Sequence, residues 1–170
     1  MLTTAQNLVI KADILASPDL NVFANDQGGA YAIADLYNKI AIPDFIVWKT
    51  VLHEQDITSL TSSEGTVWSW PAFIARSAAE QAGWARMFNG TYTINPSLLQ
   101  VRNGVADIFS GGTGAAQRTH ITAISKEKAS RIEKLLANTA SGSGTLPAPA
   151  TRVFVGTISF SEVFAARNQL

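Results

Sequence analysis

The 170-residue chain contains no cysteine, and it carries no excess of charge of either sign. Without cysteine there can be no disulfide, no thiolate nucleophile and no Cys-based zinc site. Thirteen basic residues balance thirteen acidic ones, whereas proteins that bind nucleic acid usually need a basic excess to neutralise phosphates. We therefore expect no sequence-specific nucleic-acid partner.

Long hydrophobic runs are also missing. No segment approaches the ~20 apolar residues that are needed to span a bilayer, and the start, Met1–Thr4, does not resemble a signal peptide. We expect a protein made in the cytoplasm with no membrane partner. What the chain does have is apolar material, 46% against only 15% charged residues, which fits a surface that is partly covered by partner proteins.

Helical periodicity dominates what is present. Thr3 and Gln6 form a capping box for a helix over 3–16, in which Leu8, Ala12 and Leu15 share one face. Similar signals predict further helices near 29–41, shortly after 53, and over 70–88, 95–108, 114–138 and 160–168. Ser159 and Glu162 form a second capping box, at the start of the last of these helices.

Two segments have the composition of strands, 45–52 and 152–158, and they could pair as a small antiparallel ribbon. The predicted fold is therefore mainly α, a bundle of about five to six helices with a two-stranded β ribbon. We expect a helical domain over 1–138 and a C-terminal strand and short helix, 152–170, that pack back on it.

Between these parts lies a segment rich in Gly, Ser and Pro, 139–151, which predicts an extended arm. Such an arm could embrace a neighbouring subunit. The candidate assembly contacts within it are Ser141, Gly142, Ser143, Gly144, Leu146, Pro147 and Pro149.

Aromatic residues concentrate in the segment 68–88, and they suggest a core anchor or a partner-binding patch. Trp68 and Trp70 are two positions apart, so both cannot point inward from one helix. We add both tryptophans to the candidate assembly contacts.

Signals of chemistry are weak. His53, Glu54 and Asp56 could form an acid–base cluster, but the same residues suit the polar first turn of a short helix. His120 lacks a second ligand at metal-binding spacing, and the glycines of 111–114 do not form a phosphate loop. No catalytic residue, metal or cofactor is expected.

Six segments, in this order, resemble a group of small proteins encoded among the virion genes of tailed bacteriophages. They are Leu8–Leu15, Asn25–Asn38, Pro43–Thr50, Thr93–Gly104, Ala129–Leu136 and Gly156–Ala166. The resemblance covers nearly the whole chain, although 55–84 fits it less well.

This resemblance implies a non-enzymatic structural protein of the virion, of the head–tail connector or adaptor type found in the neck. It implies a homo-oligomeric ring whose partners are further copies, the portal protein, and neck or tail proteins. One alternative is a minor capsid, cement or tail-completion protein of the same particle. An alternative of another class is a small helical enzyme or ligand-binding protein that uses the His53–Asp56 cluster.

Overall fold

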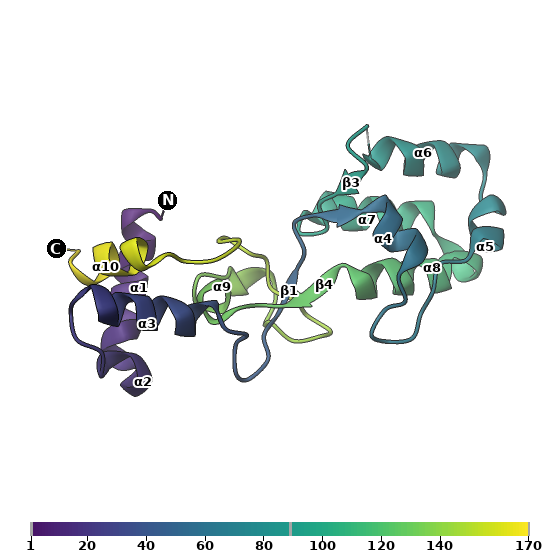
Figure 1. Ribbon diagram of the computed structural model, residues 1–170. Coiled ribbons are helices and arrows are strands. Elements are labelled where there is room, and N and C mark those ends of the chain that lie inside the picture. The colour runs from purple at the N-terminus through teal and green to yellow at the C-terminus, as the bar shows by residue number, and fades with distance from the viewer. Residues whose placement is uncertain (1, 89, 170) are drawn as a thin grey trace. The chain divides into compact units, whose positions relative to one another are not determined.

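The structure is a computed structural model that describes residues 2–88 and 90–169. It is mainly helical with small two-stranded sheets, which confirms the predicted fold class. The chain forms two compact units (Figure 1): unit 1 comprises Met1–Ile46 and Lys128–Leu170, and unit 2 comprises Val47–Glu127. This division differs from the single domain expected over 1–138, because the chain leaves unit 1 near residue 46 and returns near 128.

Unit 1 is built from helices at both ends of the chain. They are α1 (Thr4–Ala16), α2 (Pro18–Asn21), α3 (Gln27–Asn38), α9 (Arg131–Leu135) and α10 (Phe160–Arg167). The last helix, α10, packs against α1 and α3. Capping boxes begin α1 and α10, at Thr3 and Ser159 respectively, as the sequence predicted. The buried core cluster of this unit is aliphatic apart from the fully buried Tyr37, and Phe23, Phe154 and Phe160 pack against it.

The buried face of α1 is not the expected one. Ile10 and Ile14 are buried in the core of unit 1, at 0% and 2% exposure. Leu8 and Leu15 are instead 46% and 61% exposed, and Ala12 is exposed as well. Because α1 is apolar on both of these faces, helical spacing alone could not show which one the fold would cover.

The core of unit 2 is rich in aromatic residues, among them Trp68, Trp84 and Phe88. Its elements are β2 (Leu52–His53), α4 (Glu54–Ser59), α5 (Trp70–Ile74), α6 (Ala78–Phe88), β3 (Thr93–Ile94), α7 (Leu99–Ile108) and α8 (Gly111–Ile124). Strands β2 and β3 are antiparallel, with Leu52 opposite Ile94. The helix expected over 70–88 is interrupted between Ile74 and Ala78, and the helix expected from Asn95 starts at Leu99.

Where the chain passes between the units, β1 (Ile46–Trp48) pairs with β4 (Lys126–Lys128). This pairing corrects the predicted ribbon, because 152–158 forms no strand, and only Thr151 just before it makes an isolated bridge, to Asn138. It also corrects the helix expected over 114–138. That helix ends at Ile124, where the Ser125 hydroxyl donates to the Ile121 carbonyl (2.6 Å), and strand β4 follows.

Candidate functional site

The segment 139–151 is a closed loop and not the extended arm that its composition predicted. A short 3₁₀ turn, η1 (Thr139–Ser141), opens it, and the bridge between Asn138 and Thr151 closes it. Inside the loop, the Gly144 amide donates to the Ala148 carbonyl (3.0 Å). The loop therefore satisfies much of its own backbone hydrogen bonding, as a compact surface loop does.

Residues of unit 1 outside the loop also bind it. The Ile46 amide donates to the Gly144 carbonyl (2.7 Å), and the Ala150 amide donates to the Ile46 carbonyl (3.0 Å). Gly144 has φ 75°, and a Cβ atom on it would lie 2.0 Å from the Phe45 ring. A Cβ on Gly142 would lie 2.2 Å from the Pro149 carbonyl oxygen. These glycines permit close packing and are not signs of a flexible linker.

The predicted contact residues of this loop are therefore of two kinds. Gly144 and Pro149 are buried within unit 1, and Gly142 is half-buried. The residues that remain exposed are Ser141, Ser143, Leu146 and Pro147. Leu146 is 49% exposed, so the loop presents an apolar tip that is already folded.

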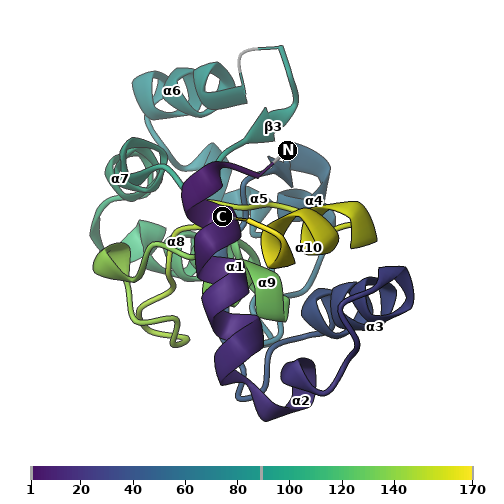
Figure 2. The ribbon, with the colours of Figure 1, turned by 90° about the vertical axis from the view of Figure 1, so that its left-hand side faces the viewer.

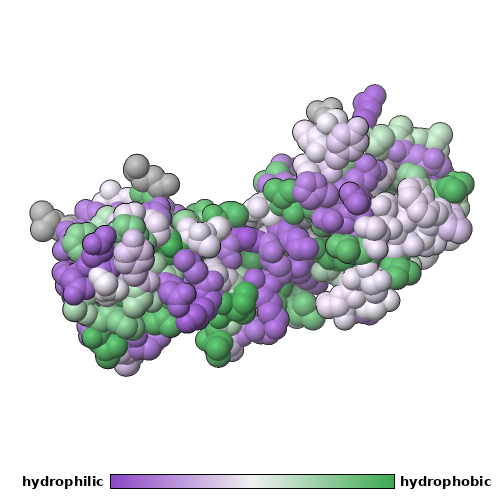
Figure 3. Space-filling view, in the orientation of Figure 1, coloured by the Kyte–Doolittle hydropathy of each residue, from purple (hydrophilic) through white to green (hydrophobic). Residues whose placement is uncertain are grey.

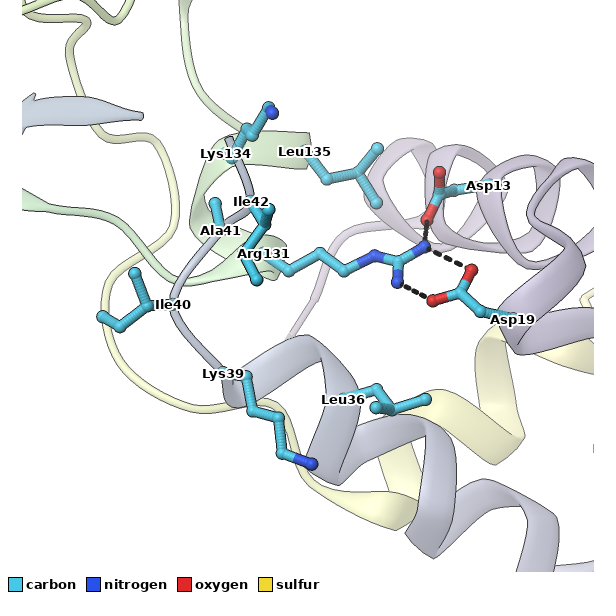
Figure 4. A pocket seen from close by; sticks show the side chains of 10 residues that line it. All are labelled: Asp13, Asp19, Leu36, Lys39, Ile40, Ala41, Ile42, Arg131, Lys134 and Leu135. Carbon is cyan, nitrogen blue, oxygen red and sulfur yellow. Dashed lines mark hydrogen bonds and ion pairs between the residues drawn. The ribbon is translucent and has the colours of Figure 1, made fainter. Parts of the chain in front are cut away.

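A groove of about 550 Å³ lies in unit 1 beside α9. Five of its lining residues are apolar, namely Leu36, Leu135, Ile40, Ala41 and Ile42, and the lysines Lys39 and Lys134 lie among them (Figure 4). We call it the unit 1 groove. Ile42 is 94% exposed and contributes almost nothing to the core of the chain itself, and Ile40 is 52% exposed.

A network of charges also lines the unit 1 groove. Arg131 of α9 points toward two carboxylates, with an ion pair to Asp19 and another to Asp13 (3.7 Å) (Figure 4). The Tyr37 hydroxyl donates to Asp13 (2.8 Å). The hydrogen bond from Arg131 lowers the pKa of Asp19, whereas burial, and then the Asp13 carboxylate, raise the pKa of Tyr37.

This network joins α9 to α1, α2 and α3, which explains its geometry without a ligand. Both carboxylates and the guanidinium already have partners, so they offer little for general acid–base work. Among the apolar lining residues, Ala41 is buried, and Leu36 and Leu135 pack against the core of unit 1. Only the exposed side chains of Ile40 and Ile42 have no such internal role. The arrangement suits a contact in which a partner covers Ile40 and Ile42 beside a polar rim.

Only one of the two tryptophans is buried, but helical spacing is not the reason, because Trp68 precedes α5 and Trp70 begins it. Trp68 is buried, and its ring centroid lies 5.5 Å from that of Trp84 and 5.9 Å from that of Phe109. Trp70 packs edge-on against Trp68 at 5.7 Å but remains 53% exposed. Trp68 therefore belongs to the core of unit 2, and Trp70 is the one available to a partner.

Trp70 also lines a second groove, of about 360 Å³, in unit 2. We call it the aromatic groove. Its other lining residues are His53, Glu54, Gln55, Thr58 and Tyr92. His53 is the N-cap residue of α4, and Tyr92 is 71% exposed with a positive φ of 54°. The structure thus brings His53 and Glu54 to one groove, but it does not place Asp56 in its lining.

His120 and Gln117 are fully buried polar residues of α8 whose roles the sequence did not reveal. The His120 ring nitrogens lie 2.8 Å from the Ile57 carbonyl oxygen and 3.1 Å from that of Thr66. The Gln117 side chain accepts from the Ser69 amide and donates to its carbonyl. Both side chains hold other segments of unit 2 against α8. The positions of these two residues in the sequence did not predict these contacts.

No group of three His, Asp or Glu side chains that could hold a metal ion occurs within residues 2–88 and 90–169. The same part of the chain has no helix that is long and apolar enough to cross a membrane. Comparison with known proteins finds no matching family model, no similar curated protein and no similar solved structure.

Proposed function

We propose that this protein is a non-enzymatic structural subunit of a tailed-phage virion, of the head–tail connector or adaptor type. In this role it forms a homo-oligomeric ring and contacts the portal protein and neck or tail proteins. The observation that carries the proposal is the exposed apolar surface of Ile40 and Ile42 in the unit 1 groove. A side chain as exposed as Ile42, at 94%, gains nothing from burial until a partner covers it.

Other exposed apolar side chains support the same proposal. Leu146 at the tip of the 139–151 loop is 49% exposed, and Val153 and Val155 just after it are 60% and 54% exposed. In the space-filling view, apolar residues reach the surface at several places beside polar ones (Figure 3). Scattered exposed apolar residues are common in monomers, whereas Ile40 and Ile42 lie together in the unit 1 groove and Leu146 lies at the tip of a folded loop.

The particle itself is proposed from the sequence. The six segments that resemble small virion proteins of tailed phages span most of the chain. A protein placed in the neck of a virion needs several contact surfaces, because it meets copies of itself and proteins on two sides. An unpaired apolar surface on a chain with balanced charge agrees with that need.

The test is incorporation into particles. In a phage that depends on this protein, Ile42→Glu should abolish incorporation while circular dichroism of the purified variant remains unchanged. Val22→Glu is the matched control, because Val22 is 75% exposed in the same unit but lies outside the groove lining. Incorporation of both variants at the level of the parent protein would contradict the proposal.

A minor capsid, cement or tail-completion role in the same virion would use the same surfaces. Cryo-electron microscopy of the particle separates these roles, because an adaptor lies between portal and tail and a cement protein lies on the capsid. Localisation on the capsid would overturn the adaptor assignment and leave the virion assignment intact.

A ligand-binding or enzymatic function is the second candidate, and the aromatic groove is the observation that favours it. Two exposed aromatic rings, Trp70 and Tyr92, line a space that also contains His53 and Glu54. If the aromatic groove binds a ligand or carries an enzymatic activity, the double variant Trp70→Ala, His53→Ala should lose that binding or activity in infected cells. Normal particle assembly by this double variant supports the structural role of unit 1 instead.

A further inference from the structure

Helix α1 has a second apolar face that unit 1 does not cover. Ile10 and Ile14 fill the core, whereas Leu8, Val9 and Leu15 are 46%, 43% and 61% exposed. In Figure 2, α1 lies in front, with α3 and α10 of the same unit beside it. A helix that is apolar on two opposite faces normally has both of them buried. We therefore expect a partner to cover the outer face of α1.

The outer face has a regular pattern. Ala5, Leu8, Ala12 and Leu15 are all exposed and follow one another at steps of three, four and three residues. These steps are those of the a and d positions in a coiled coil, here over two heptads. We call these four residues the α1 stripe. Small and large side chains alternate along it.

We propose that the α1 stripe binds the α1 stripe of a second copy of this chain, with the two helices antiparallel. In antiparallel pairs, a positions face d positions. Leu8 then faces Ala12 of the second copy, and Leu15 faces Ala5. Every large side chain meets a small one, so the layers fill evenly. A parallel pair would instead stack alanine on alanine and leucine on leucine, with gaps at each alanine layer.

The charges around the stripe spare the apolar contact itself but place two lysines on one flank of the pair. None of the four stripe residues is charged, so the apolar contact buries no ion. On one flank of the pair, Val9 packs against Val9 of the second copy. On the other flank the two Lys11 side chains approach each other, but each Nζ donates to the Gln169 carbonyl of its own chain (2.5 Å). Salt should therefore strengthen this dimer by screening the two lysines.

The size of the contact sets its strength. A helix of 13 residues is about 20 Å long at 1.5 Å per residue. One helix pair of that length covers much less than the roughly 800 Å² per partner of a stable interface. We expect a weak dimer that forms at high protein concentration. The inference rests on the proposed function only in that the chain assembles with itself. A two-fold contact closes at two copies, so a ring needs a second surface.

Cysteine cross-linking tests the proposal directly, because the natural chain has no cysteine. Ala5→Cys and Leu15→Cys variants are prepared separately and then mixed under oxidising conditions. In the antiparallel pair, position 5 faces position 15, whereas the two copies of position 5 are about 15 Å apart along the axis. We expect disulfide-linked dimers in the mixture and few in either variant alone. Equal cross-linking of each variant with itself would overturn the antiparallel pairing.

Sedimentation equilibrium measures the contact without cross-linking. Leu15→Gln should weaken the dimer at least about tenfold in Kd. Leu99→Gln is the matched control, because Leu99 on α7 is 60% exposed and Leu15 is 61% exposed. A chain that stays monomeric at millimolar concentration overturns the proposal, and so does a dimer that salt weakens or that both variants weaken equally. Incorporation into particles is a separate readout, so failure of the dimer and failure of the virion role are distinguishable.

Discussion

Substitution of Gly144 by alanine tests whether the 139–151 loop is folded onto unit 1. At φ 75° a non-glycine residue costs roughly 1–2 kcal/mol. The new Cβ would also lie 2.0 Å from the Phe45 ring, and overpacking of this kind costs typically about 1–3 kcal/mol. We therefore expect Gly144→Ala to lower the free energy of unfolding by about 2–5 kcal/mol. Urea denaturation followed by circular dichroism measures it.

The matched control is Gly65→Ala. Gly65 has nearly the same φ, 73°, but nothing lies within 4 Å of a Cβ placed on it. Gly65→Ala should therefore lower the free energy of unfolding only by the conformational cost, roughly 1–2 kcal/mol. If the loop were the mobile arm that its composition suggests, Gly144→Ala would be as mild as this control or milder. That result would show that the loop is not packed against Phe45.

Three further predictions concern buried or paired polar groups. Glu133→Gln removes the carboxylate that pairs with the buried Arg152 at 2.7 Å, and it should cost about 3 kcal/mol in urea denaturation. Arg76, by its hydrogen bond, lowers the pKa of Glu80 to about 2 from 4.5. This pair therefore stabilises the fold above pH 4.5, and the contribution is lost as the pH falls toward 2. In the Glu80→Gln variant the free energy of unfolding should therefore fall less steeply as the pH is lowered from 4.5 toward 2. His120→Leu leaves a buried carbonyl without its donor and should cost about 2 kcal/mol, measured by thermal denaturation.

Each of these three predictions has a result that contradicts it. For the buried pair, the control is Asp44→Asn, which breaks an ion pair with Lys128 whose side chains are 57% and 55% exposed. That variant should change stability by less than about 1 kcal/mol, and an equal effect of both variants contradicts the first prediction. An unchanged acid profile in Glu80→Gln contradicts the second. A His120→Leu variant as stable as the parent contradicts the third.

Local signals in the sequence predicted the starts of two helices correctly. The capping boxes at Thr3 and Ser159 form as expected, because each needs only residues three positions apart. The mainly α fold class was equally accessible, since it follows from the sum of such signals. The end of α8 could not be predicted from the sequence. No proline or glycine marks Ser125, and the pairing of β4 with β1 stops the helix there.

The candidate site shows the same limit. Leu146 and Trp70 are exposed, in agreement with their choice as contact residues, whereas Trp68, Gly144 and Pro149 are buried. Composition could not reveal that the glycines of 139–151 allow close packing, because that depends on contacts distant in sequence. The exposed Ile42 was also missed, since an isoleucine beside a proline has no local mark of exposure.

A structural part of a tailed-phage particle stays with the particle on purification. Quantitative mass spectrometry of gradient-purified particles from cells that produce this chain measures its retention, with the portal protein as the internal reference. We expect a fixed ratio of this chain to portal protein that survives high-salt washing. Recovery of the chain only in the free fraction of the lysate, with none in the particles, would show that it is not a structural part of the virion.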